Sequence, residues 1–148
     1  MTVPLIRTER LSLSVLELSD LNDIREYYLT NQAHLEPWEP ERTSAFHELA
    51  AWRQRIQLAQ DDRGSDRAVK LVFRLSGTRP IIGVCNFTNI VRGPFQACNL
   101  GYSINGTHQG RALMFEAYRL RSLICSPMSN YIGSWQTTCQ RTTAALDY

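Results

Sequence analysis

The stretch between residues 69 and 104 most constrains the fold, because it holds three consecutive segments with strand character. Residues 69–75 alternate apolar and basic side chains, and residues 81–91 are apolar enough for a strand buried on both faces. Residues 97–104 place apolar side chains at every second position. Turns that contain glycine, at 76–78 and 92–94, separate the three segments. We therefore predict three consecutive strands in one sheet.

The flanking segments extend this pattern. Leu11 and Leu13 alternate with serines, which predicts a short first strand. A first helix is expected after an N-cap at Ser19 or Asp20, and a second after Thr43 or Ser44. Apolar residues follow at helical spacing, namely Leu21, Ile24 and Tyr28 in the first helix and Leu49, Trp52 and Ile56 in the second. With a third helix over residues 107–117, the order is β-α-α-β-β-β-α, an α/β (α+β) fold with a mixed sheet.

Composition narrows the class of protein. A chain of 148 residues with 43% hydrophobic and 20% charged residues is typical of a single soluble domain. A formal net charge of +2 does not favour nucleic acid or a membrane surface, and no apolar run approaches the ~20 residues of a membrane span. The four cysteines show no metal-ligand spacing, so we expect reduced thiols and no metal. These features predict a cytoplasmic protein.

The segment NLGYSINGTHQGRALMFEA, residues 99–117, carries the chemistry. A strand passes through a polar turn into a helix that is expected to begin with QGRA. Unpaired N–H groups at a helix N-terminus favour anions, Gly110 lets a ligand approach the backbone, and Arg111 adds a positive charge. The pattern fits a site for a pyrophosphate or another polyanion. It also fits a glycine that merely closes a strand-to-helix turn.

At this point the chain resembles the GNAT N-acetyltransferases. QGRALM stands where that family has its Q/R-x-x-G-x-G/A pyrophosphate loop, and the predicted element order is that of the first half of the GNAT fold. IRTERLSL, HLEPWEPER, GVCNFTNIVRGPFQACNLGYSI and GTHQG-ALMFEA further resemble the ribosomal-protein-alanine N-acetyltransferases of the Rim type. This resemblance covers residues 5 to 118. It implies acetyl-CoA as the donor and a protein N-terminal amine, usually of alanine in a ribosomal protein, as the acceptor.

The resemblance also implies positions for the cofactor. It places the pantetheine arm along the backbone of Tyr102, Ser103 and Ile104. It places the pyrophosphate on the backbone amides of five residues, Gln109, Gly110, Arg111, Ala112 and Leu113. Ala112 stands where the superfamily usually has glycine, so a methyl group is expected to crowd the pyrophosphate without removing the amide donors.

For the acceptor, the proline-bounded loop that contains Glu36, Trp38 and Glu39 is of interest, because in this superfamily such a loop tends to flank the acceptor. Trp38 and Glu39 are the candidate substrate-binding residues, with the carboxylate attracting a protonated amine. The alternative is a surface loop pinned by a buried tryptophan. The sequence assigns no catalytic residue.

The chain changes character after Ala117. Residues 119–148 are rich in serine and threonine and show no sustained period, whereas the family continues with a strand, a helix and an Asn-x-x-Ser motif. Synonymous codons for residues 124 to 148 can be chosen so that a frame offset by two bases reads approximately MFAHEQLHRIMANYMPANNRSARL. The codons of Trp135 and Gln136 must give alanine in that frame. We interpret the tail as the product of a frameshift near residues 117 to 123; the alternative is a diverged but authentic C-terminus.

This interpretation divides the chain into a GNAT domain, residues 1–118, and an aberrant, poorly ordered tail, residues 119–148. The acid that protonates the leaving thiolate is then expected to be missing. The alternatives to an active enzyme are an inactive acetyl-CoA-binding fragment and a protein-interaction module without cofactor. Loss of the fifth strand of the family fold is expected to leave residues 97 to 104 as an open edge that favours a homodimer.

Overall fold

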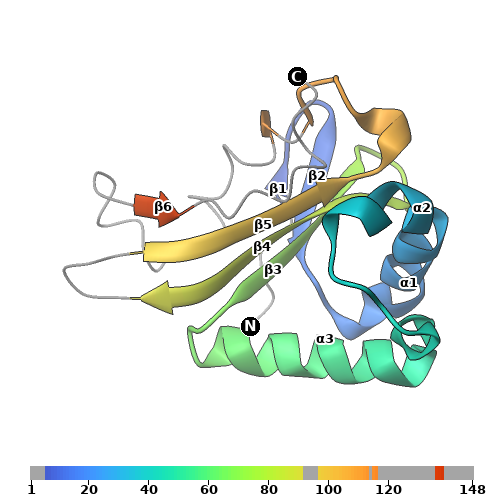
Figure 1. Ribbon diagram of the computed structural model, residues 1–148. Coiled ribbons are helices and arrows are strands. Elements are labelled where there is room, and N and C mark those ends of the chain that lie inside the picture. Colours follow the sequence, from blue (N-terminus) through green and yellow to red (C-terminus); the bar gives the residue numbers. More distant parts are fainter. Residues whose placement is uncertain (1–5, 92–96, 114, 117–135, 139–148) are drawn as a thin grey trace.

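A computed structural model of the chain describes residues 6–91, 97–113, 115–116 and 136–138. In this part of the chain one sheet has the order β1-β2-β3-β4-β5-β6 (Figure 1). The strands are β1 (Ile6–Arg7), β2 (Leu11–Val15), β3 (Val69–Leu75), β4 (Ile81–Val91), β5 (Ala97–Ile104) and β6 (Gln136–Thr138). Neighbouring strands are antiparallel from β1 to β5, and β6 runs parallel to β5. The sheet is therefore mixed only through β6.

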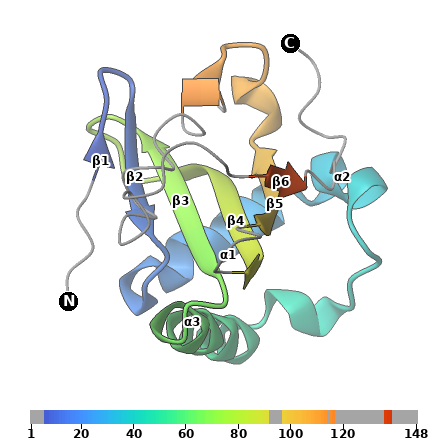
Figure 2. The same cartoon turned by 90° about the vertical axis from the view of Figure 1, so that its left-hand side faces the viewer.

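The helices α1 (Leu21–Thr30) and α3 (Leu49–Gly64) pack against one face of this sheet (Figure 2). Between them lie the short helix α2 (Gln32–Leu35) and the 3-10 turns η2 (Glu36–Trp38) and η3 (Ser44–His47), while η1 (Leu18–Asp20) precedes α1. The side chains that form this core are Leu16, Ile24, Tyr27, Leu35, Trp52, Ile56, Val72, Ile81 and Val84. The residues from the helices recur at helical spacing, as the sequence predicts. None of the described helices is both long and apolar enough to cross a bilayer.

The opposite face of the sheet carries two further apolar clusters. One joins Leu11 and Leu13 of β2 to Phe73 of β3 and Ile104 of β5, and Leu113 lies on it. The other includes Leu71, Cys85 and Cys98. Successive strand residues point to opposite faces, so β3 contributes Val72 to the helix-covered core and Leu71 and Phe73 to these clusters. Both faces of β3 and β4 are therefore buried, which explains the long apolar run of β4.

Three sequence predictions need correction. Leu49 was expected on the buried face of the second helix, but it is 45% exposed because it lies in the first turn of α3, ahead of the buried Trp52. The short strand β1 was not predicted, since two residues are too few to show a period. Asp20 does not cap α1 with its side chain; it accepts a hydrogen bond from the Glu17 amide and pairs with Arg74 at 2.7 Å.

The predicted open edge of β5 is also wrong in part. Within the predicted aberrant tail, β6 pairs with Ala97, Cys98 and Asn99. Among the described residues, no strand pairs with the side of β5 opposite β4 beyond Asn99. The remainder of the tail, 119–135 and 139–148, lies outside the described residues, so its predicted disorder stays a prediction, as does the frameshift.

Gly83 of β4 is required by the packing of Phe73. A Cβ atom at residue 83 would lie 2.0 Å from the Cζ atom of that ring, and Phe73 is 0% exposed. Gly83→Ala is therefore expected to lower the free energy of unfolding by about 1–3 kcal/mol, because a buried ring and its neighbours must shift. Urea denaturation measures this change. Gly101→Ala is the matched control, since a Cβ there meets no described atom within 4 Å; equal losses in the two variants would contradict the packing explanation.

Candidate cofactor and acceptor site

The chain leaves β5 through a turn that the sequence predicted as the start of a helix. The 3-10 turn η4 (Gly106–His108) comes first, and the Asn105 side chain accepts a hydrogen bond from the Thr107 amide at 3.1 Å. Residues 109–112 then form a turn and bends, and helical conformation begins only at Leu113. The prediction that QGRA forms the first helical turn is wrong. Gly110 and Ala112 have φ angles of 72° and 56°, in the left-handed region that an α-helix excludes.

This backbone conformation suits an anion. Left-handed residues at alternate positions are typical of concave backbone turns whose N–H groups converge on anions. Within the described part of the chain, the amides of Gly110, Arg111 and Ala112 donate no backbone hydrogen bond. Buried or not, such donors need an acceptor from water or from a ligand. The candidate anion site is therefore a turn with left-handed residues and not the predicted helix N-terminus, but both present backbone N–H donors.

The turn at residues 109–112 is hereafter called the cofactor turn. Residues near the N-terminus of the chain stabilise its conformation. The Arg10 side chain donates a hydrogen bond to the Arg111 carbonyl at 3.0 Å and pairs with Glu116 through two nitrogens, at 2.8 and 2.5 Å. The Thr8 hydroxyl also donates to Glu116. Burial alone would raise the pKa of Glu116, but the hydrogen bonds from Thr8 and Arg10 and the charge of Arg10 lower it below its usual value. Thr8 and Arg10, between β1 and β2, thus hold the C-terminal part of the cofactor turn and the Glu116 side chain that follows it.

The three predicted pantetheine residues lie on β5, beside the cofactor turn. Tyr102, Ser103 and Ile104 pair on one side with Cys85, Val84 and Gly83 of β4. Ser103 is buried, and its hydroxyl lies 2.8 Å from the hydroxyl of Tyr27 in α1. Burial raises the pKa of Tyr27, so it stays protonated and neutral. This hydrogen bond positions α1 against the strand that is expected to carry the thioester.

The predicted acceptor loop approaches the cofactor turn through His34. The His34 Nε2 atom lies 3.3 Å from the Gln109 Nε2 atom, and the His34 ring also packs against Gly106. Three residues beyond the end of α2, Trp38 occupies the last position of η2, and its side chain lies outside the described part of the structure. The structure thus brings α2, and with it the start of the acceptor loop, next to the cofactor turn.

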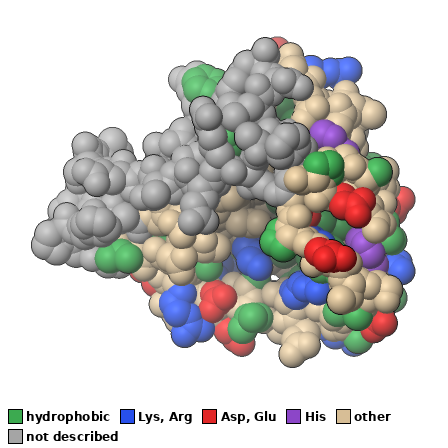
Figure 3. Space-filling model, in the orientation of Figure 1, with side chains coloured by type: hydrophobic (Ala, Val, Ile, Leu, Met, Phe, Trp, Pro, Cys, Tyr) green, Lys and Arg blue, Asp and Glu red, His purple; other side chains and the backbone are tan. Residues whose placement is uncertain are grey.

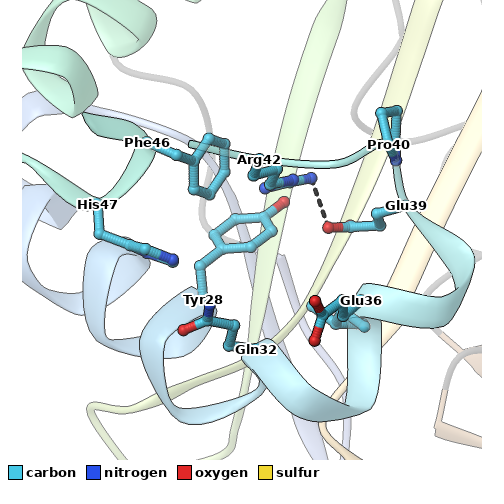
Figure 4. A pocket seen from close by; sticks show the side chains of 9 residues that line it. Tyr28, Gln32, Glu36, Glu39, Pro40, Arg42, Phe46 and His47 are labelled. Carbon is cyan, nitrogen blue, oxygen red and sulfur yellow. Dashed lines mark ion pairs between the residues drawn. The ribbon is translucent and has the colours of Figure 1, made fainter. Parts of the chain in front are cut away.

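Glu39 already forms an ion pair with a neighbouring residue. Its carboxylate pairs with Arg42 at 2.5 Å, and both side chains line a small pocket with Tyr28, Glu36 and Phe46 (Figure 4). Burial raises the pKa of Glu39 and Arg42 lowers it, with burial the larger effect. An incoming amine would have to displace Arg42 from this carboxylate. The described residues include no group of three or more His, Cys, Asp or Glu side chains suited to a metal.

A family model described as an acetyltransferase (GNAT) domain matches residues 10–124, which includes the cofactor turn and the strands that flank it. The chain belongs to the GNAT acetyltransferase family. It is 38% identical over 117 residues to the [ribosomal protein uS5]-alanine N-acetyltransferase of Escherichia coli (strain K12), a match that covers 78% of this chain and 60% of the relative. The chain therefore spans less than two thirds of the length of that relative.

Solved structures agree with this assignment. The ribosomal-protein-S5-alanine acetyltransferase from Vibrio fischeri is 29% identical with a TM-score of 0.78, over 86% of this chain and 69% of that one. RimJ of Mycobacterium smegmatis, solved in complex with CoA-disulfide, has a TM-score of 0.69 over 78% of this chain and 56% of that one. At 21% identity the second comparison shows the GNAT fold alone. The predicted GNAT fold and the resemblance to ribosomal-protein-alanine acetyltransferases are confirmed.

Sequence reasoning missed the residues that hold the cofactor turn. Thr8 and Arg10 lie in IRTERLSL, and Glu116 lies in GTHQG-ALMFEA, two segments that carried the family resemblance. Their opposite charges were a usable signal, but no periodicity links residues separated by 106 positions. Arg42, at the end of HLEPWEPER, was missed in the same way.

The left-handed conformation of Ala112 predicts that glycine fits better at this position. Ala112→Gly removes about 1–2 kcal/mol of backbone strain, and the greater entropy of the unfolded chain costs about 0.5–1 kcal/mol, so the net gain in stability is expected between zero and about 1.5 kcal/mol. Gly110→Ala makes the opposite change at a φ of 72° and should lose about 1 kcal/mol. Urea unfolding of both variants provides the measurement. A clear loss of stability in Ala112→Gly would show that the methyl group makes packing contacts that outweigh the strain.

The anchoring of Glu116 predicts a pH-dependent stability. A carboxyl whose pKa is lowered by folding stabilises the folded state above its unfolded pKa of about 4.3, and this contribution is lost as pH falls through the folded value. Glu116→Gln is expected to cost on the order of 1 kcal/mol at pH 7, and progressively less as the pH falls below the unfolded pKa. Thermal unfolding between pH 7 and acid pH tests the expectation. Glu9→Gln, an exposed glutamate in the same hairpin, is the control; a deficit of Glu116→Gln that does not shrink as the pH falls would contradict the ion-pair explanation.

Proposed function

We propose that this chain binds acetyl-CoA and transfers its acetyl group to the N-terminal amine of a cytoplasmic protein, with alanine of a ribosomal protein as the acceptor. The observation that supports this most is the cofactor turn, whose unpaired amides at Gly110, Arg111 and Ala112 lie beside β5 and are held in place by Arg10. The similarity to the uS5-alanine acetyltransferase supports the choice of acceptor.

In this proposal the pyrophosphate binds the amides of Gln109 through Leu113, with Arg111 contributing a positive charge. The pantetheine arm follows Tyr102, Ser103 and Ile104 along β5. The start of the acceptor loop lies next to this turn through the His34–Gln109 contact. Trp38 and Glu39 then flank the amine, and Glu39 attracts it by exchanging Arg42 for the substrate.

The reaction needs few groups from the protein. The lone pair of the neutral amine attacks the thioester carbonyl carbon, a C–N bond forms, the C–S bond breaks, and the nitrogen loses a proton. Coenzyme A leaves as a thiolate that takes up a proton. Backbone amides can stabilise the oxyanion. A general acid positioned to protonate the leaving thiolate raises the rate by a further factor of ~10²–10⁴. No described residue is assigned as that acid, which keeps a non-catalytic acetyl-CoA-binding fragment as the second candidate function.

Coenzyme A titration of the full chain by calorimetry tests the cofactor site. Arg111→Glu should weaken binding at least tenfold, because a repelling charge replaces an attracting one, and tenfold corresponds to ~1.4 kcal/mol. Arg7→Glu, an exposed arginine in β1, controls for the change in net charge and should stay within about twofold of the original. Equal weakening in the two variants would contradict binding at the cofactor turn.

Acetyl transfer to an alanine-initiated peptide, followed by thiol release, distinguishes the two candidate functions. This chain is compared with a version in which the inferred reading frame is restored. We expect the restored version to be much faster. Comparable turnover of the two would overturn the frameshift interpretation, and cofactor binding without transfer by either would favour the non-catalytic fragment.

A further inference from the structure

A second, larger cavity lies between the helices and the sheet. Its volume is about 200 Å³. Figure 3 shows a hollow with Lys and Arg side chains on part of its rim and Asp and Glu side chains close by. The lining residues are Leu16, Ile24, Tyr28, Arg42, Phe46, Trp52, Arg55, Lys70, Leu71, Val72, Val84 and Asn86. The lining includes three cationic side chains and no aspartate or glutamate. Its polar groups are therefore dominated by hydrogen-bond donors.

Lys70 is the cation least compensated by the protein. No described residue forms an ion pair or a hydrogen bond with its ammonium group. Burial lowers the pKa of Lys70, the charge of Asp62 offsets this in part, and the charge of Arg55 lowers it further. Asp62 itself pairs with Arg67 at 2.8 Å. A strand lysine that is half-buried beside an empty volume, with no partner, lacks the compensation that buried charges usually have.

The other donors are held rigidly by aromatic rings. Arg55 stacks on Phe46, with its guanidinium carbon 4.2 Å from the ring centroid, and donates a hydrogen bond to the Phe46 carbonyl at 2.7 Å. Trp52 is 5% exposed, and its indole Nε1 has no hydrogen-bond partner in the described structure. Arg42 is already paired with Glu39. The excess of positive charge therefore comes from Arg55 and Lys70, with the indole N–H as an additional unsatisfied donor in the wall.

The cavity lies next to the strand expected to carry the thioester. Asn86 in its wall pairs with Lys70 of β3 on one side and with Gly101 of β5 on the other. Neighbouring strands are about 5 Å apart, so a peptide whose amine reaches β5 can place a side chain from one of its next few residues in the cavity. A volume of 200 Å³ is below that of pockets for drug-sized ligands and suits a single side chain or a small acid.

We propose that this cavity, through Lys70, Arg55 and Asn86, binds a carboxylate group, supplied by an acidic side chain near the N-terminus of the acceptor. The identity of the source rests on the proposed acetyltransferase function, whereas carboxylate binding itself does not. A free small dicarboxylate has the same chemistry and is the other source to be distinguished.

Binding is measured on the full chain without acetyl-CoA, so that the result does not depend on turnover. The first arm uses alanine-initiated peptides in pairs, with glutamate or glutamine at the second, third or fourth position. The second arm uses succinate, with uncharged succinamide for comparison. We expect one glutamate peptide to bind at least tenfold more tightly than its glutamine partner, as a charge-assisted hydrogen bond to a partly buried cation provides.

Lys70→Met keeps the unbranched shape of the side chain, which is one atom shorter, removes its charge, and should abolish this preference. Arg53→Gln removes a charge from the exposed side of α3 and is the matched control that should retain it. Asn86→Asp is the second variant. It places a carboxylate opposite Lys70, and should raise the melting temperature while it removes the preference for glutamate. A variant that merely unfolds would lose the preference for glutamate but would not have a raised melting temperature.

The outcomes are distinct. A preference for glutamate that disappears in Lys70→Met and Asn86→Asp but not in Arg53→Gln supports the proposal, whether or not acetyl transfer is detected. Binding of succinate with the same pattern, and no discrimination among peptides, supports the carboxylate site and assigns it to a free acid. Equal binding of all charged and uncharged probes, or a preference unchanged in Lys70→Met, overturns it.

Discussion

The ion pair between Arg10 and Glu116 joins two parts of the chain that are 106 residues apart, and the conformation of the turn at residues 109–112 depends on it. One guanidinium contacts both the carboxylate that follows the cofactor turn and the Arg111 carbonyl within it. The turn contains two left-handed residues and few hydrogen bonds of its own, so its conformation must be maintained from outside. Arg10 and Thr8 provide that support from the first hairpin. The unpaired amides are consequently already oriented before a ligand arrives, which lowers the entropic cost of binding.

Much of the sheet was predictable from the sequence, because its strands follow simple rules. The turn that contains Gly77 separates Val69–Leu75 from Ile81–Val91, and the alternation in Leu11–Val15 matches its burial. The two residues of β1 have no period. The pairing of Gln136–Thr138 with β5 was also not predictable, because it depends on a partner distant in sequence. Local patterns predict elements well, but they contain little information on long-range pairing.

The candidate site shows the same contrast between local patterns, which are predictable, and long-range contacts, which are not. Resemblance located the cofactor turn, yet it suggested a helix start where Gly110 and Ala112 adopt left-handed conformations. The substitution of alanine for the family's usual glycine was visible in the sequence, and only the φ angle shows that it introduces backbone strain. Glu39 was chosen for its charge, but its ion pair with Arg42 depends on a rigid aromatic group formed by Tyr28, Phe46 and Trp52. The alternation in Val69–Leu75 marks Lys70 only as a strand residue, because the cavity beside it arises from the packing of α1, η3 and α3 on the sheet.

The buried hydrogen bond between Tyr27 and Ser103 has a consequence for the motions of the protein. It links α1 to the C-terminal end of β5 through two hydroxyls in the core, where separating them would leave both without partners. The helix and the strand should therefore open to solvent together, as one cooperative unit with slow amide exchange. The segment from Glu36 to Glu48 has mostly exposed residues and forms only short 3-10 turns. In the proposed function, adjustment to an acceptor then falls to this segment, while the strand that is expected to carry the thioester keeps a fixed position.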